Sequence, residues 1–325
     1  MPLRTFRLRC LAAQMLLGGD FMGTMTRSRN RALFMFLAPA VVLFLFIFAF
    51  PLIRTIYLSF FRVADLAGTE LTFRGLKQYK ELIYTPLFQT SFKNIFLIWS
   101  LGGIALFGWV FLFSMLLNSG IKGKKFFRAV IYLPNLVPAV AMVAMWTQYI
   151  YHPRFGFLKT VFETLGLENL AKIQWNSADM LFWGMLIAYV WGGVGWTLII
   201  VLAGMERIPT ELYEVARLDG ASTFQQFRHV TLPLLRDVLR VTFVFWSIGQ
   251  INLFTFPKLW TPVVPQEGTY TPAIYLYQIS FGTRYEATAI ADIGKGAAIA
   301  VMLLLLVLLF SFLINRLFGE EELEF

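Results

Sequence analysis

The sequence predicts an all-α integral membrane protein with six transmembrane helices. Hydrophobic residues make up 58% of its 325 residues and charged residues only 14%, whereas soluble domains carry about 25% charged residues. Six segments are apolar over the roughly 20 residues that a helix needs to cross the hydrocarbon core. Helices are expected in these segments because a helix pairs all of its backbone groups internally, as lipid requires.

Polar stretches separate the six apolar segments. The segments are residues 32–53, 95–117, 130–150, 181–204, 238–259 and 291–318. Three arginines precede the first segment, and the short loop 118–129 carries four basic residues and no acidic one. Short basic loops stay in the cytoplasm, so both sequences predict a cytoplasmic N-terminus. The loop 54–94 is also basic, but it is long enough to be translocated regardless of its charge. Six crossings then place both termini in the cytoplasm.

A folded polar element is predicted between the fourth and fifth apolar segments, at residues 208–233. Apolar residues recur there at helical spacing up to Gly220, which suits a left-handed helix end because it has no Cβ. Ser222 and Gln225 have the spacing of a capping box, which begins a second helix. Pro233 is expected to end that helix. The topology predicted from the basic loops places this element on the cytoplasmic side.

The residues of this element resemble a known motif. In order they are Glu214, Val215, Ala216, three residues, Gly220, nine residues, Val230, Thr231, Leu232 and Pro233. This resembles the EAA loop of permease subunits in binding-protein-dependent ABC importers, in which EAA, three residues, G and nine residues precede I-x-L-P. Val215 and Val230 are its two departures. The resemblance implies that the segment 205–237 is a cytoplasmic ATPase-coupling loop, with Glu214, Ala216, Gly220, Leu232 and Pro233 as its motif residues.

The resemblance extends over residues 33–318 and is closest to the carbohydrate-uptake branch of maltose and glycerol-phosphate type permeases. The matching stretches are YLSF at 57–60, FRGLKQY at 73–79, residues 92–95, FFRAVIYLP at 126–134, and residues 191–204 with Ile208, Pro209 and Glu211. The chain departs from the family at 261–267, where TPVVPQE replaces a GGGP turn, and at 294–298, where GKGAA replaces GYASA. These departures indicate a different extracytoplasmic rim.

The resemblance implies a function and a set of partners. The chain would be the permease subunit that moves a sugar or sugar-like solute into the cytoplasm through a bacterial or archaeal plasma (inner) membrane. Its partners would be two ABC ATPase subunits, a second homologous permease subunit, expected to be a paralogue, and an extracytoplasmic solute-binding protein. The sequence has no Walker-type loop, so no cofactor of its own is expected and ATP is bound by the partner subunits.

Polar residues inside the predicted spans mark a candidate solute pathway. Ser247, Gln250 and Phe254 are spaced i, i+3 and i+7 along the fifth span, and Trp246 is adjacent, so one helix face would combine hydrogen-bonding groups with aromatic rings. Sugars need both. Alternatively, Ser247 and Gln250 only bind neighbouring helices. Three further residues complete the predicted pathway: Asn135, which lies between two prolines expected to kink the third span, Tyr189 and Gly193.

Other classes of function have weaker support in the sequence. The residues suggest neither catalysis nor a metal site, since Cys10 is the single cysteine and the two histidines, His152 and His229, are far apart. The net charge of +9 is spread over loops rather than gathered into a nucleic-acid-binding stripe, and membrane lipid explains it better. A non-sugar cargo such as a polyamine remains an alternative. So does a self-contained carrier or channel, although that calls for paired intramembrane carboxylates or an inverted repeat with broken helices. Asp292 is the single acidic residue in the predicted spans, and its spacing predicts that it pairs with Lys295.

Three regions are therefore expected along the chain. Residues 1–31 form a basic cytoplasmic tail, in which Met22 and Met25 are alternative initiators. Residues 32–318 form the transmembrane domain. Residues 319–325 form an acidic cytoplasmic tail.

Overall fold

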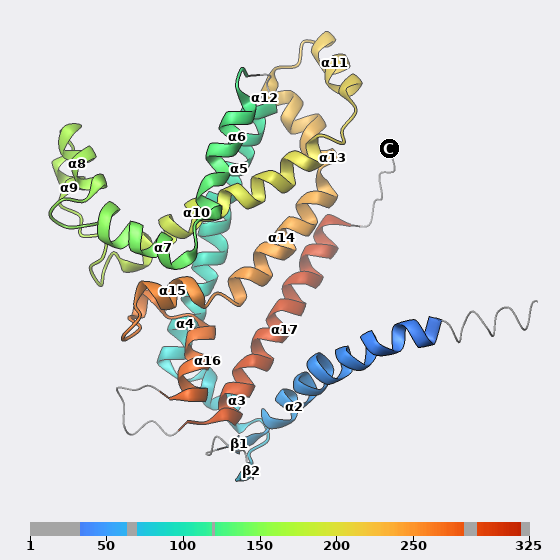
Figure 1. Ribbon diagram of the computed structural model, residues 1–325, viewed down its shortest axis with the longest axis vertical. Coiled ribbons are helices and arrows are strands. Elements are labelled where there is room, and N and C mark those ends of the chain that lie inside the picture. Colours follow the sequence, from blue (N-terminus) through green and yellow to red (C-terminus); the bar gives the residue numbers. More distant parts are fainter. Residues whose placement is uncertain (1–32, 64–69, 119–120, 283–290, 320–325) are drawn as a thin grey trace, which may run out of the picture. The chain divides into compact units, whose positions relative to one another are not determined.

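The computed structural model describes residues 33–63, 70–118, 121–282 and 291–319. The chain divides into two compact units, Met1–Tyr57 and Leu58–Phe325, and each is described by itself. The predicted basic tail, with its alternative initiators Met22 and Met25, lies outside the described residues, as does the acidic tail beyond Gly319. Helices dominate the described residues, as predicted (Figure 1).

The first unit contains the first predicted span. A single apolar helix runs over Leu33–Leu58. It contains the π-helix η1 (Leu45–Ala49) directly before α2 (Phe50–Leu58), whose second residue is Pro51. Because proline has no backbone amide to donate, the wider turn just before it accommodates the missing hydrogen bond.

Three further spans of the second unit are continuous apolar helices, which confirms the second, fourth and sixth predicted segments. The longest consists of α4 (Pro86–Leu97), the π-helix η2 (Ile98–Gly102) and α5 (Gly103–Asn118). The others are α10 (Leu181–Met205) and α17 (Ile293–Phe318). Each exceeds the roughly 20 residues that a membrane crossing needs.

The third predicted span is broken by its prolines, as expected. The segment Lys124–Leu136 comprises α6 (Lys124–Tyr132) and the 3₁₀-helix η3 (Leu133–Leu136), and Ala139–Ile150 comprises α7 (Ala139–Met145) and the π-helix η4 (Trp146–Ile150). The two halves meet at 98°. Pro134 and Pro138 cause the break, because neither donates a backbone hydrogen bond and the residue before a proline disfavours helix.

The fifth predicted span, residues 238–259, is wrong as a continuous helix. Helix α14 (Arg236–Ile251) ends early, and the short α15 (Thr255–Trp260) follows. A helix continuing through Pro257 would leave the carbonyl of Leu253 unpaired. Instead the Thr271 hydroxyl donates to that carbonyl at 2.7 Å. By length and composition the described residues contain four candidate spans, or five if the bent pair counts as one.

The remaining elements connect the spans. Strands β1 (Phe61–Val63) and β2 (Leu71–Phe73) form an antiparallel hairpin with Phe61 opposite Phe73, so the all-α prediction missed a small sheet. Short helices complete the connections: α3 (Lys77–Ile83), α8 (Phe157–Thr164), α9 (Glu168–Ala171), α11 (Thr210–Leu218), α12 (Thr223–Gln226), α13 (Leu232–Leu234), α16 (Pro272–Phe281), the 3₁₀-helix η6 (Glu267–Thr269) and the π-helix η5 (Phe227–Thr231).

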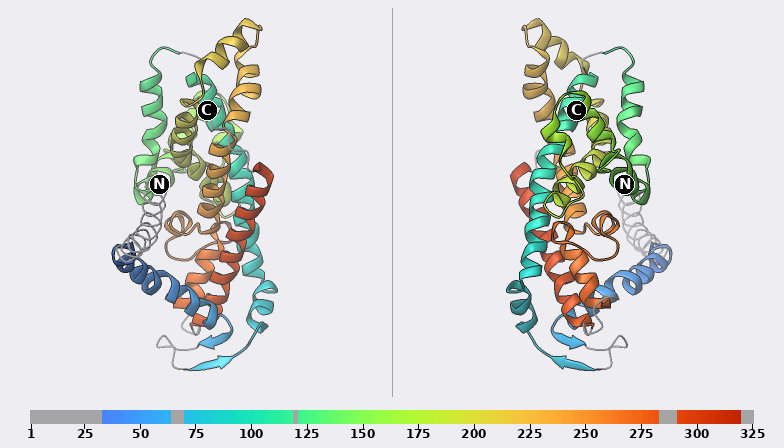
Figure 2. Two further views of the ribbon diagram at one scale, coloured as in Figure 1. Left: turned by 90° about the vertical axis from the view of Figure 1, so that its right-hand side faces the viewer. Right: turned by 90° about the vertical axis from the view of Figure 1, so that its left-hand side faces the viewer.

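Packing in the second unit is organised around two hydrophobic clusters. The larger one joins α5, α10 and α14 with the broken span, and the smaller one joins α4, α16 and α17. Helix α10 packs along α5, and α17 packs along both α14 and α16. Figure 2 shows α17 and the long helix that ends in α5 running lengthwise through this unit. In Figure 1, α11 and the β1–β2 hairpin lie at opposite ends of it.

Candidate solute cavity and coupling element

The helix-turn-helix predicted at residues 208–233 is present. Helix α11 ends at Leu218, and Gly220 takes a φ of 77°, a left-handed conformation that favours glycine. The predicted capping box is also confirmed: the backbone amide of Gln225 donates to the Ser222 hydroxyl at 3.3 Å, and the Ser222 amide donates to the Gln225 side chain at 2.7 Å. Both features are set by adjacent residues, which made them predictable.

Pro233 does not end the second helix, contrary to the prediction. Helix α12 continues through the π-helix η5 into α13, where Pro233 is the second residue. The wider turn of η5, just before Pro233, accommodates the missing amide hydrogen bond. The break comes at Leu235, whose φ of −88° and ψ of 3° separate α13 from α14. The element therefore continues nearly directly into the next long helix.

The motif residues lie in an exposed helical element that is held on one side by a hydrogen bond. Glu214, Gly220 and Pro233 are exposed, while Ala216 and Leu232 are half-buried. On the inner side, the hydroxyls of Tyr213 in α11 and Thr231 in η5 are hydrogen-bonded at 3.0 Å, and Thr231 is buried. On the outer side, Val215 and Leu218 are 57% and 88% exposed. The element is thus a braced helix pair with an apolar outer surface. We call residues 210–234 the coupling element.

A cavity of about 350 Å³ lies between α5, the broken span, α10 and α14. Five of the seven predicted pathway residues line it: Asn135, Tyr189, Gly193, Trp246 and Gln250. They come from three segments that are far apart in the sequence. Its volume is within the range of about 300–1,000 Å³ found for small-molecule sites.

Gln250 lines this cavity, and its side-chain oxygen is buried without a partner. Its side chain is 2% exposed, and its Nε2 donates to the Tyr189 hydroxyl at 3.1 Å. Its Oε1 is buried and has no hydrogen-bond partner among the described residues. A buried carbonyl oxygen without a donor is costly, and a ligand hydroxyl would satisfy it. The other amide, Asn135, donates to the carbonyl of Gly192 at 3.3 Å.

Ser247 and Phe254 do not line the cavity. The Ser247 hydroxyl accepts a hydrogen bond from the Trp99 indole at 2.9 Å and donates to the carbonyl of Phe243, also at 2.9 Å, so it joins helices. Phe254 lies beyond the end of α14 and packs against Tyr277, with ring centroids 5.4 Å apart. The predicted shared face of Ser247, Gln250 and Phe254 is therefore wrong, because it assumed a helix continuous through position 254.

Several residues that line the cavity were not predicted from the sequence. They are mostly apolar or aromatic: Leu106, Met142, Trp196, Thr197, Ile200, Thr242, Phe245 and Phe256. A signal was present in α10, since Tyr189, Gly193, Trp196 and Ile200 recur at the spacing of one helix face. The position of Phe256 in the cavity lining was not predictable from helical spacing, because α15 brings this residue back toward Tyr189. The ring centroids of Phe256 and Tyr189 are 5.3 Å apart.

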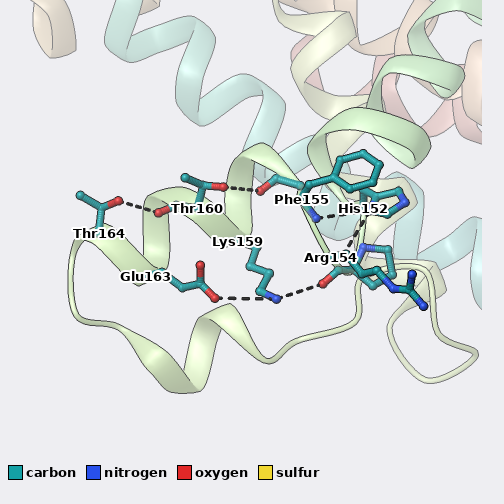
Figure 3. A network of polar contacts seen from close by, with 9 residues as sticks. His152, Arg154, Phe155, Lys159, Thr160, Glu163 and Thr164 are labelled. Carbon is teal, nitrogen blue, oxygen red and sulfur yellow. Dashed lines mark hydrogen bonds and ion pairs between the residues drawn. The ribbon is translucent and has the colours of Figure 1, made fainter.

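A second, polar pocket of about 560 Å³ is formed by the hairpin that contains α8 and α9. Figure 3 shows its polar contacts: Lys159 pairs with Glu163 at 3.7 Å and donates to the carbonyl of Pro153 at 3.2 Å. The Nδ1 atom of His152 accepts from the backbone amide of Arg154 at 3.2 Å. At the base of the hairpin, burial raises the pKa of the Tyr151 phenol. His152 thus orders a turn.

Asp292 has partners other than the Lys295 side chain expected from their spacing. One carboxylate oxygen accepts from the backbone amide of Lys295 at 3.0 Å, which caps α17, and from the amide of Val63 at 3.3 Å. The other lies 3.9 Å from Nε of Arg62. Asp292 therefore fastens the β1–β2 hairpin to the start of α17.

Membrane-length apolar helices surrounding a cavity of mixed aromatic and amide character define a polytopic membrane transport protein. Residues 111–319 match the family described as "Binding-protein-dependent transport system inner membrane component", and the chain belongs to this family. It is 33% identical over 277 residues to a "Probable ABC transporter permease protein" of Pyrococcus horikoshii, covering 84% of this chain and 91% of that protein.

Two further similarities extend the comparison. A trehalose/maltose transport system permease protein of Thermococcus litoralis is 28% identical over 269 residues, covering 80% of this chain and 84% of that protein. The fold is similar to a chain of a bacterial alginate ABC transporter solved in complex with an alginate pentasaccharide-bound periplasmic protein. That match has a TM-score of 0.68 at 21% identity and covers 90% of this chain and 96% of the other. At this identity the second similarity concerns the fold.

Proposed function

We propose that this permease moves a sugar or sugar-like solute into the cytoplasm by way of the cavity between α5, the broken span, α10 and α14. The observation that carries the proposal is the unpartnered Gln250 Oε1 in a cavity lined with aromatic rings. A sugar hydroxyl donates to such an oxygen, while the C–H faces of a sugar ring pack on Trp196, Trp246 and Phe256. The trehalose/maltose system of the Thermococcus relative supports the same substrate class.

The charge of the cavity separates this proposal from a polyamine cargo. Among the described residues, those that line the cavity are all uncharged. A polyamine would leave several ammonium groups without a carboxylate partner in a low-dielectric site, at a cost of several kcal/mol per ion. A neutral polyol meets no such penalty, so the alternative of a polyamine is disfavoured.

The transport mechanism follows from the position of the coupling element. We place six crossings in the membrane: helix α14 spans about 24 Å at 1.5 Å per residue, and residues 252–260 complete its crossing. In this arrangement, both termini and the coupling element lie in the cytoplasm. One of two ATPase subunits contacts the exposed side of α11 around Val215 and Leu218. A second permease subunit completes the pathway, and an extracytoplasmic binding protein delivers the solute at the opposite end.

A purification followed by reconstitution tests the proposal. The tagged chain is solubilised from its native membrane, and the proteins that remain bound are identified by mass spectrometry. A P-loop ATPase and a second permease are expected. The complex is then placed in liposomes with the binding protein encoded beside it, and uptake of labelled maltose, trehalose and spermidine is compared with and without ATP. ATP-dependent uptake of a sugar supports the proposal; ATP-independent uptake by the chain alone contradicts it.

A further inference from the structure

A row of five aromatic side chains connects the coupling element to the wall of the cavity. It begins at Phe227 in η5, continues through Phe111 and Phe107 on successive turns of α5, and reaches Phe243 and Trp246 on α14. The ring centroids are 5.9 Å apart for Phe227 and Phe111, 6.1 Å for Phe111 and Phe107, 4.0 Å for Phe107 and Phe243, and 6.4 Å for Phe107 and Trp246. We call this row the aromatic relay.

The cavity end of the relay has little freedom to move independently. The indole of Trp246, which lines the cavity, donates to the carbonyl of Trp99 at 3.0 Å. A Cβ atom built on Gly103 would lie 2.9 Å from the Trp246 indole nitrogen, so helix and ring are in close contact. Phe107 is 4% exposed. Because protein interiors are close-packed, a displacement of Phe107 along α5 must also displace Trp246.

The coupling end of the relay crosses a region that is otherwise loosely packed. A cavity of about 280 Å³ lies between the end of α5 and the coupling element, lined by Met115 and Asn118 on one side and by Tyr213 and Thr223 on the other. Phe227 also lines this cavity but is 7% exposed, and its ring contacts Phe111.

The covalent route from the coupling element into the membrane is weakened by a break. Helix α13 stops at Leu234, and the backbone of Leu235 is no longer helical, with a φ of −88° and a ψ of 3°. Leu235 is a single interruption between α13 and α14. The contacts of Phe227 with Phe111 and of Phe107 with Phe243 form a second route, which runs through α5 and reaches α14 beyond this interruption.

We propose that Phe107 and Phe111 are positioning residues that transmit the movement of the coupling element to the Trp246 wall of the solute cavity. This inference rests on the proposed function, since it requires an ATPase to move the coupling element. If the relay transmits this movement, replacing Phe111 with a residue that lacks a ring should weaken the response of the cavity to nucleotide. The protein should remain folded and bound to its ATPase.

A cysteine placed in the cavity as a reporter tests this prediction. Gly249 lines the cavity, and a Cβ atom at this position meets nothing within 4 Å. In a C10S background, G249C supplies the single thiol of the chain, because Cys10 is its one cysteine. The complex purified with its bound ATPase is placed in liposomes. The rate of maleimide labelling at position 249 is measured with and without ATP plus vanadate. Nucleotide is expected to change this rate, and F111L to reduce the change about threefold or more.

Matched variants separate transmission from general packing. F113L makes the same substitution two residues along α5, where Phe113 stacks on the half-exposed Trp109, and is expected to keep the full response. F111Y retains the ring and should also keep it. F227L removes the other ring of the first contact and must give the same loss as F111L, whether or not F111L assembles. The double variant F111L/F227L should lose no more than either single variant, because the two rings act in series.

The outcomes distinguish this inference from the function on which it rests. A full nucleotide response in F111L or F227L overturns the relay while leaving the proposed function intact. A loss that is equal in F113L assigns the effect to packing of α5 and also overturns the relay. An absence of any nucleotide response in the unaltered G249C complex overturns the relay. If no ATPase purifies with the chain, the proposed function is overturned together with the relay.

Discussion

Gln250 and Ser247 lie less than one turn apart on α14, yet they are satisfied in different ways. The Ser247 hydroxyl uses both its donor and its acceptor within the bundle, on Phe243 and Trp99. Gln250, which lines the cavity, uses its amide nitrogen on Tyr189 and leaves its oxygen without a partner. The sequence spacing put both residues on one candidate binding face. Their partners separate a residue that joins helices from one that can receive a ligand.

Replacing Gln250 with leucine tests this distinction. Q250L keeps the approximate volume but removes the oxygen, so KM for ATP-dependent uptake of the transported sugar should rise about tenfold, the equivalent of roughly 1.4 kcal/mol for a lost buried hydrogen bond. Maximal ATP hydrolysis should stay within about twofold. The measurement is sugar uptake into liposomes against sugar concentration.

Ser247→Ala is the matched control for this prediction. It removes the acceptor of the half-buried Trp99 indole, so it should lower the free energy of unfolding by about 0.5–1.5 kcal/mol without changing KM. If S247A raised KM as strongly as Q250L, the assignment of the two residues would have to be reversed.

At the level of single residues, the sequence predicted which groups are unusual but not which of them meet. Asn135, Tyr189, Gly193, Trp246 and Gln250 were chosen as polar, aromatic or small residues within apolar segments, and all line the cavity. Phe254 was placed by counting residues along a helix. That count fails wherever the helix ends, and α14 ends at Ile251, before position 254 is reached.

Helix α5 is the element that contacts both the coupling element and the cavity, and its glycines reveal how tightly it is packed. A Cβ atom on Gly103 would lie 2.9 Å from the Trp246 indole nitrogen, whereas one on Gly108 would meet nothing within 4 Å. Gly103→Ala should therefore force a shift and destabilise the detergent-solubilised protein by about 1–3 kcal/mol. Gly108→Ala should be neutral or stabilising by up to about 1 kcal/mol, since alanine favours helix. Thermal unfolding of the two variants measures the difference, and equal melting temperatures would contradict the close contact.

The coupling element depends on the left-handed turn at Gly220. Gly220→Val places a β-branched residue at a φ of 77°, which costs about 1–2 kcal/mol or more. The turn should open and α11 should lose its fixed orientation. Uptake is expected to fall at least tenfold, while membrane insertion and the amount of protein remain unchanged.

Ala221→Val provides the control for Gly220→Val. It adds the same side chain at the next position, which has no positive φ, and should retain most of the uptake. Uptake and ATP hydrolysis are measured on the same liposomes. Wild-type uptake by Gly220→Val would count against a rigid coupling element.

At the level of elements, the sequence predicted features set by neighbours in the chain and missed those set by distant contacts. The capping box at Ser222 and the proline-induced break of the third span depend on residues within about one helical turn, and both are present. The turn after α14 is held by Thr271, whose hydroxyl donates to the Leu253 carbonyl across 18 positions. The β1–β2 hairpin is held partly by Asp292, which lies beyond most of the chain. Local patterns carry no information about such partners.

At the scale of the second unit, the coupling element and the α8–α9 hairpin have different relations to the bundle. The coupling element follows the end of α10 at Met205, and the hairpin precedes its start at Leu181. Since α10 is a single apolar helix of 25 residues, long enough to cross a membrane, the two segments are predicted to lie on opposite sides of it. The charge pattern predicts that the coupling element is on the cytoplasmic side, because the basic loop before α6 lies at the same end of α10, where Arg128 pairs with Glu206 at 3.0 Å.

Thiol labelling in intact cells tests this arrangement. Thr164 ends α8 and Asp219 lies in the turn after α11, and both are exposed. In a C10S background, T164C should react with a membrane-impermeant maleimide added to cells with a permeable outer layer. D219C should react only after the inner membrane is opened, because the reagent cannot otherwise reach the cytoplasm. The reverse pattern would invert the topology and remove the coupling element from the reach of any ATPase. Equal labelling of both thiols from outside would mean that α10 does not cross the membrane.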